Sequence, residues 1–157
     1  GGGICMDGRI HQGMHSIGGE WGHMVVDPLG TQCYCGNRGC VETLISGTGV
    51  EHHFLKNHGR PLDMRSIVSG FRSGDPDCLE SFERFLDDFG RCLAGPVSLL
   101  DPDVVVLGGG LSNIEELYGQ GKQLVYQYAF HPDPRTPVLK NTLGDSAGVF
   151  GAAWIGI

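Results

Sequence analysis

The sequence lacks the features that would place it in several common classes of protein. No apolar run approaches the roughly 18 residues of a membrane-spanning segment, and no charged-then-apolar signal region is visible near the start. Basic residues are few, because 11 Lys and Arg stand against 18 Asp and Glu, for a net charge of −7. Sequence-independent nucleic-acid binding needs a basic face. We therefore expect a cytoplasmic protein that binds neither a membrane nor nucleic acid.

The residues that are present suit a folded domain with many tight turns. Of the 157 residues, 40% are hydrophobic and 18% are charged, which does not resemble a disordered tail. The 27 glycines fall in clusters without a collagen period. We see no internal repeat and no linker, and the length suits one compact domain or a large piece of one. Because the chain opens on Gly1-Gly2-Gly3 without an initiator Met, we expect a fragment.

Several short segments have the pattern of β-strands. Residues 4–6 and 9–11 flank Asp7-Gly8, a favoured two-residue hairpin turn. Residues 104–107 form a continuous apolar run of β-branched type, which is typical of a strand buried on both faces. Two further short strands are expected at residues 24–28 and 136–141.

The clearest helix is predicted from Pro76 to about Leu100. Asp75 is a good cap and proline suits the first helical position. Apolar residues then recur every three or four positions, while Pro96 predicts a kink or an irregular last turn. Further helices are expected at about 42–57, at 64–72 after the cap Asp63, from Ser112 or Asn113 to near Phe130, and from Asp145 or Ser146 to Trp154. Strand, glycine turn and helix in alternation predict an α/β fold.

One histidine and three cysteines have the composition of a closed zinc site. His23, Cys33, Cys35 and Cys40 lie within eighteen residues, and Cys33 and Cys35 are too close in sequence to form a comfortable disulfide. Three thiolates and one imidazole complete a tetrahedral zinc shell, so such a zinc is structural rather than hydrolytic. The alternative is a loop of reduced cysteines beside a separate core histidine. The other cysteines, Cys5, Cys78 and Cys92, are expected to be small core residues.

Two glutamates bracket the cysteine cluster. Glu20 precedes His23, and Glu42 follows the last cysteine by two residues. Carboxylates held beside a rigid loop suit the hydroxyls of a sugar, which lose water on binding and need fixed partners. A zinc-bound His23 would keep its second ring N–H as a donor, to a carboxylate or to a ligand hydroxyl. The alternatives are a solvated turn carboxylate at Glu20 and a helix N-terminal charge at Glu42.

A glycine run follows the apolar strand segment. Gly108-Gly109-Gly110 lies between that segment and a predicted helix, where α/β folds bind phosphates and nucleotides. The run matches neither the dinucleotide fingerprint nor the P-loop. A tight packing turn explains it equally well, and Gly1-Gly2-Gly3 before the hairpin is ambiguous in the same way.

Taken together, these motifs resemble the ROK family of bacterial sugar kinases, repressors and open reading frames. The match runs nearly end to end, and the cysteine signature is its most specific part. Several segments look most like the fructokinase (manno(fructo)kinase) branch. The segments that match the family as a whole are Glu20-Trp21-Gly22-His23, Cys33 through Glu42, Ser46-Gly47-Thr48-Gly49, 101–112 and 144–153, while those most like the fructokinase branch are 20–23, 33–36, 42–49 and 151–154.

The resemblance implies an actin-like ATPase (ribonuclease H-like) fold of two lobes, with ATP and sugar between them. It implies a structural zinc on His23, Cys33, Cys35 and Cys40, and contacts from Glu20, His23 and Glu42 to sugar hydroxyls. Gly1, Gly2 and Gly3 look like the end of a phosphate loop, and Gly108, Gly109 and Gly110 would lie against the adenosine. We see no match here to the family's first phosphate motif or to its catalytic aspartate, both of which belong to the N-terminal lobe.

These similarities lead us to expect that residues 1–157 are the C-terminal lobe of an ATP- and Mg²⁺-dependent hexose kinase. The lobe by itself is expected to be inactive, because phosphoryl transfer needs groups from both lobes. Fructose is the favoured substrate, ahead of glucose, mannose and N-acetylmannosamine, and a homodimer is expected. The alternatives are the effector-binding lobe of a ROK repressor and a stand-alone, zinc-stapled sugar-binding module.

Overall fold

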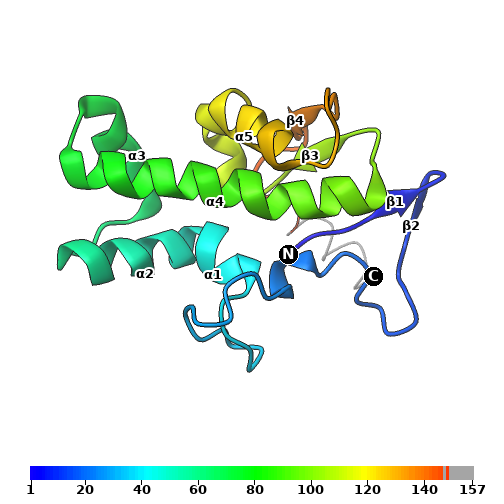
Figure 1. Ribbon diagram of the computed structural model, residues 1–157, viewed down its shortest axis with the longest axis horizontal. Helices are drawn as coiled ribbons and strands as arrows, with labels where there is room; N and C mark the ends of the chain where they lie inside the picture. Colours follow the sequence, from blue (N-terminus) through cyan, green and yellow to red (C-terminus); the bar gives the residue numbers. More distant parts are fainter. Residues whose placement is uncertain (147, 149–157) are drawn as a thin grey trace. The chain divides into compact units, whose positions relative to one another are not determined.

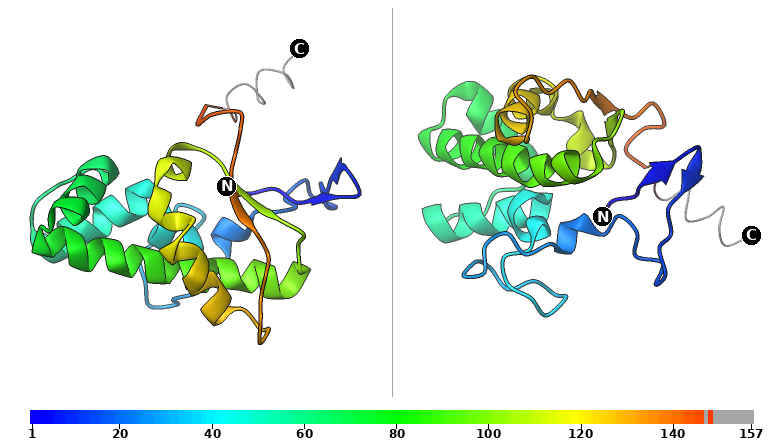
Figure 2. Two further views of the ribbon diagram at one scale, coloured as in Figure 1. Left: turned by 90° about the horizontal axis from the view of Figure 1, so that it is seen from above. Right: turned by 45° about the vertical axis from the view of Figure 1, so that its right-hand side comes forward.

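The computed structural model describes residues 1–146 and 148, and the chain divides into two compact units (Figures 1 and 2). The first unit is Gly1–Leu62 and the second is Asp63–Ile157. The boundary is abrupt, because Asp63 already caps the first helix of the second unit. The chain therefore forms two compact units, whereas the length suggested one compact domain or a large piece of one. The expected last helix falls on residues outside those described, apart from its first few positions.

The first unit begins with the predicted hairpin. Strands β1 (Cys5–Met6) and β2 (Arg9–Ile10) pair antiparallel, with Cys5 opposite Ile10. The turn residues Asp7 and Gly8 both have positive φ angles, 51° and 72°, as an Asp-Gly hairpin turn requires. Both strands are exposed, so the expectation that Cys5 is a core residue is wrong.

The helix expected at 42–57 is in fact two helices. After the 3₁₀ turn η1 (Trp21–His23), the chain forms α1 (Val41–Ile45) and α2 (Gly47–His58). Ser46 between them is extended, at φ −77° and ψ 156°, and its hydroxyl accepts a hydrogen bond from the Gly49 N–H at 3.0 Å. A serine cap therefore starts a new helix where apolar spacing alone suggested a continuous one.

The strand expected at 24–28 is wrong. Val25 makes only an isolated bridge with Cys40, and the N–H groups of Val26 and Asp27 both donate to the Gly39 carbonyl. These hydrogen bonds hold residues 25–27 against residues 39–40, so the chain folds back on itself around the cysteines. It has no neighbouring strand with which to form a ladder among the described residues.

The described part of the second unit is mainly helical, and Figure 1 labels its helices. They are α3 (Met64–Ser73), α4 (Pro76–Leu100) and α5 (Gln120–Tyr128), and α4 packs against both of the others. The predicted caps are confirmed, because the Asp63 and Asp75 carboxylates accept hydrogen bonds from the Ser66 and Cys78 N–H groups. The helix α4 continues through Pro96 to Leu100. Its buried stripe includes Phe82, Phe85, Leu86, Phe89, Cys92, Leu93 and Val97, with Cys78 near its start.

A pair of parallel strands completes the second unit. Strand β3 (Val105–Leu107) pairs with β4 (Val138–Lys140), and α5 lies between them in the sequence (Figure 2). This β–α–β order confirms the α/β prediction. The strand is not buried on both faces, since Val106 is 57% exposed and Val104 is 41% exposed. Within the described residues the sheet has two strands, so one edge of β3 has no paired strand.

The segment between β3 and α5 is less regular than predicted. Two 3₁₀ turns, η2 (Gly110–Asn113) and η3 (Glu115–Leu117), precede the helix, which begins only at Gln120. Ser112 does not cap a helix, because its hydroxyl donates to the Gly109 carbonyl at 2.7 Å and is buried. Among the described residues, no helix is long and apolar enough to cross a bilayer.

Candidate metal centre and neighbouring polar residues

A tightly folded loop in the first unit brings the cysteines together. Gly39 is the pivot, because its carbonyl accepts from Val26 and Asp27 and its N–H donates to Thr31. Its φ is +64°, and a Cβ atom there would lie 1.5 Å from the Asp27 carbonyl oxygen. Only glycine fits such a position. The sequence therefore supplies a glycine where the loop must pass against its own backbone.

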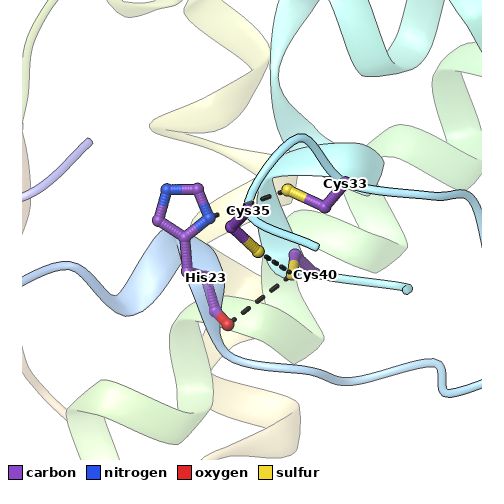
Figure 3. A group of neighbouring side chains, drawn as sticks. All are labelled: His23, Cys33, Cys35 and Cys40. Atoms are coloured by element: carbon purple, nitrogen blue, oxygen red, sulfur yellow. Dashed lines mark hydrogen bonds between the residues drawn. The ribbon is translucent and has the colours of Figure 1, made fainter. Parts of the chain in front are cut away.

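The four predicted metal ligands meet in this loop, as Figure 3 shows. His23, Cys33, Cys35 and Cys40 each offer one ligand atom, and all four atoms lie within 4.8 Å of one another. His23 Nδ1 is 3.7 Å from Cys33 Sγ, and Cys35 Sγ is 3.6 Å from Cys40 Sγ. Zn–S and Zn–N bonds of about 2.3 and 2.1 Å at tetrahedral angles put neighbouring ligands about 3.5–3.8 Å apart. The donors and their spacing fit one tetrahedral zinc ion.

The three thiols differ in burial and acidity. Cys33 and Cys40 are buried, whereas Cys35 is exposed. A backbone hydrogen bond at Asn37 lowers the pKa of Cys35 to about 7, and burial raises the pKa of Cys40 to about 12. Metal binding requires thiolates and releases their protons. A cation bound by these thiolates would therefore displace the protons that the thiols carry.

The second ring nitrogen of His23 faces a tyrosine. His23 Nε2 is 3.0 Å from Tyr34 Oη, and the two rings are edge-to-face with centroids 5.1 Å apart. The sequence analysis did not single out Tyr34. Its position between two ligands, Cys33 and Cys35, is the signal that could have identified it.

The two predicted sugar-binding glutamates lie on either side of this group. Glu20 is the residue immediately before η1, and Glu42 is in the first turn of α1, directly after the Cys40 cap. A Cβ on Gly22 would lie 3.8 Å from Glu42 Oε2, so that carboxylate is close to η1. The charge of Glu42, with a smaller contribution from Glu20, raises the pKa of Tyr34. Glu42 and Glu20 are thus close enough to Tyr34 for their charges to act on its phenol.

The first glycine run packs against the same segment. A Cβ on Gly2 would lie 2.5 Å from Trp21 Nε1, and a Cβ on Gly19 would lie 2.7 Å from Gly3 Cα. Gly2 and Gly3 thus pack beside Gly19 and Trp21, the residues on either side of Glu20 in the sequence. The second run lies in the other unit: Gly108 to Gly110 are exposed at the end of β3, with Gly109 at φ +72°. No Cβ built on those three glycines meets another atom within 4 Å, so packing alone does not require them.

Comparison with known proteins identifies relatives over the whole chain. The sequence pattern of the ROK family matches residues 1–157. An N-acetyl-D-glucosamine kinase of Yersinia pseudotuberculosis is 35% identical over 99% of this chain and 54% of its own length. Another from Photobacterium profundum is 36% identical over 100% of this chain and 55% of its length. The chain thus spans about half the length of the curated relatives it matches.

Solved structures show the same likeness. A ROK hexokinase from Thermus thermophilus matches 97% of this chain and 53% of its own, at 34% identity and a TM-score of 0.84. A ROK glucokinase from Streptomyces griseus, in complex with glucose and AMPPNP, matches 98% of this chain and 55% of its own. Its sequence identity is 28% and its TM-score is 0.83. A ROK transcriptional regulator, a homologue of the E. coli MLC protein, matches 88% of this chain and 38% of its own. Its sequence identity is 27% and its TM-score is 0.71.

Proposed function

The chain belongs to the ROK family and has the fold of its sugar kinases, and on that premise we propose that it is the C-terminal lobe of an ATP-dependent hexose kinase. The observation that carries the proposal is the Cys3His cluster, with Glu42 close to the turn η1 and Glu20 directly before that turn. Glu20, Glu42 and His23 offer two acceptors and a donor to a small ligand rich in hydroxyls. We propose that they bind the hydroxyls of the sugar.

His23, Cys33, Cys35 and Cys40 would hold a structural zinc. With four protein ligands the ion has no open position, so its contribution is to stiffen the loop and to orient His23. Metal analysis of the full-length protein, purified without chelator, should find about one zinc per chain. A Cys40→Ala variant should lose the metal, whereas Cys92→Ala, a buried cysteine outside the cluster, should keep it. Less than about 0.2 zinc per chain in the unaltered protein would contradict the assignment.

ATP would be bound by the glycine runs. Gly1 to Gly3 would present backbone N–H groups to phosphate oxygens, and Gly108 to Gly110 would lie against the adenosine. Mg²⁺ would neutralise phosphate charge in the complete enzyme. The base that takes the proton from the sugar hydroxyl would come from the N-terminal lobe. Residues 1–157 alone should therefore be inactive, and turnover near 1 s⁻¹ by this fragment would contradict the lobe assignment.

The next question is which sugar the kinase phosphorylates. The sequence analysis favours fructose, while the relatives reported above are named for N-acetyl-D-glucosamine, hexose and glucose. An acetamido group differs from a hydroxyl in size and in its hydrogen bonds, so one site will discriminate between these sugars. We propose a hexose or N-acetylhexosamine as substrate, with fructose and N-acetyl-D-glucosamine as the pair to be compared first.

The direct test is ADP release by the full-length protein with ATP, Mg²⁺ and each sugar in turn. We expect phosphorylation of at least one of them. Glu42→Gln should lower kcat/KM about 10- to 100-fold, because a hydrogen bond to a charged group contributes about 1.5–3 kcal/mol. Glu80→Gln, an exposed glutamate of α4, is the matched control and should leave kcat/KM unchanged. No phosphorylation of any sugar would refute the kinase proposal.

A sugar-sensing repressor is the second candidate, because a ROK transcriptional regulator shares this lobe. Both functions keep the sugar site, so sugar binding does not separate them. The coding sequence upstream of Gly1 does. A segment with the kinase aspartate supports the enzyme, whereas a helix-turn-helix supports the repressor.

In either case we propose a homodimer, which sedimentation of the full-length protein will test.

A further inference from the structure

Tyr34 is an exposed side chain that is nonetheless held in one place. The side chain is 82% exposed to solvent, yet its backbone is fixed on both sides by the neighbouring ligands Cys33 and Cys35. Its hydroxyl reaches His23 Nε2 at 3.0 Å, and its ring meets the imidazole at an interplanar angle of 89°. An exposed tyrosine directed at a ring nitrogen in this way needs an explanation beyond packing.

The arrangement of the ring nitrogens fixes the direction of this hydrogen bond. His23 Nδ1 faces the thiols, 3.7 Å from Cys33 Sγ, so Nδ1 is the nitrogen that a metal ion would take. An imidazole bound through Nδ1 carries its proton on Nε2 and donates from there. Tyr34 Oη is then the acceptor, and its own O–H remains available to another partner.

The phenol oxygen occupies the place that the sugar would need. The proposed function assigns the Nε2–H of His23 to a sugar hydroxyl, and a single N–H makes one well-aligned hydrogen bond. Tyr34 Oη is a hydroxyl oxygen already at that distance from Nε2. A sugar hydroxyl and the phenol therefore compete for the same proton.

We propose that Tyr34 is the gate of the sugar site: its phenol caps His23 when no sugar is bound and yields the Nε2–H to the sugar hydroxyl. This inference rests on the proposed function, because it takes His23 to be a sugar contact. Tyr34 is mostly solvent-exposed, so moving its ring away breaks mainly the hydrogen bond between its hydroxyl and His23 Nε2. Tyr34 thus sets the affinity for sugar through His23, without contact to the phosphoryl group.

The test is Tyr34→Phe in the full-length, zinc-loaded protein, with Tyr128→Phe as the matched control. Tyr128 is another partly exposed tyrosine, and its hydroxyl bonds to Asp87 in the second unit. Glucose, fructose and N-acetyl-D-glucosamine are titrated calorimetrically into each protein. For the sugar that binds, Tyr34→Phe should lower Kd about two- to tenfold, the equivalent of one ordinary hydrogen bond. KM should fall with it while kcat stays unchanged, and Tyr128→Phe should alter neither.

A second readout follows the gate without sugar. In ¹⁵N-histidine-labelled protein, His23 should carry its proton on Nε2 in both proteins, and that proton should exchange with water faster in Tyr34→Phe. An unchanged or raised Kd in Tyr34→Phe, while the unaltered protein binds sugar, overturns the gate alone. Equal proton exchange in the two proteins also overturns it. If none of the three sugars binds either protein, the proposed function and the gate both fall.

Discussion

At the scale of single residues, Gly39 makes the most specific prediction. A Cβ at Gly39 would sit 1.5 Å from the Asp27 carbonyl oxygen, whereas a Cβ at Gly36 would meet no atom within 4 Å. Both glycines have positive φ, 64° and 97°. Gly36→Ala should therefore incur only the left-handed backbone cost of about 1–2 kcal/mol. Gly39→Ala must also open the loop, and should be destabilising by more than about 3 kcal/mol.

Urea unfolding and zinc content of the two full-length variants measure this difference. Gly39→Ala should also lose most of its zinc, because the loop cannot open without separating Cys40 from its partners. Gly36→Ala should keep zinc at the level of the unaltered protein. Equal destabilisation by the two substitutions would show that the Asp27–Gly39 contact does not hold the loop.

At the scale of elements, the long helix α4 offers a matched pair of glycines. A Cβ on Gly90 would lie 2.4 Å from the Leu124 Cβ of α5, while a Cβ on Gly95 would meet no atom within 4 Å. Alanine gains about 0.5–1 kcal/mol in a helix relative to glycine. At Gly90 this gain is outweighed by overpacking, which costs about 1–3 kcal/mol. At Gly95 the following Pro96 crowds a Cβ and offsets the gain in part.

We therefore expect Gly90→Ala to lower the free energy of unfolding by about 1–2 kcal/mol, and Gly95→Ala to change it by less than about 1 kcal/mol. Urea denaturation with equal m-values for both variants is the measurement. If Gly90→Ala is as stable as the unaltered protein, the close approach of α4 and α5 is not a constraint on the fold.

The elements also show what a sequence pattern can and cannot predict. The caps Asp63 and Asp75 were predictable, because the side chain that caps a helix is adjacent to it in the sequence. The exposure of Val106 was not predictable, because the burial of a strand depends on which distant segments cover it. The break at Ser46 lies between these cases. Ser46 is visible in the sequence as a possible cap, but a single helix was expected at about 42–57.

The candidate site follows the same distinction. The four metal ligands were predictable because their residue types and spacing are unusual. Tyr34 could have been singled out by its position between Cys33 and Cys35, but its bond to His23 depends on how the loop folds and could not be predicted. Glu20, Glu42 and the glycine runs were proposed from family resemblance. The structure places Glu20, Glu42 and Gly1 to Gly3 near the cluster, and their roles stay predictions.

At the scale of the whole molecule, the two units are expected to respond differently to loss of metal. The loop of residues 24–40 has isolated bridges, turn hydrogen bonds and side-chain hydrogen bonds, but no regular helix or strand. Ten residues of α4 are buried, so burial of apolar surface stabilises that helix. A chelator should therefore raise amide hydrogen exchange in the loop at least about tenfold and leave α4 unchanged. Cys40→Ser without chelator should give the same pattern, which separates metal loss from any other action of the chelator. A similar increase in α4 would mean that the chain unfolds as one unit, and no change in the loop would mean that the cluster holds no metal.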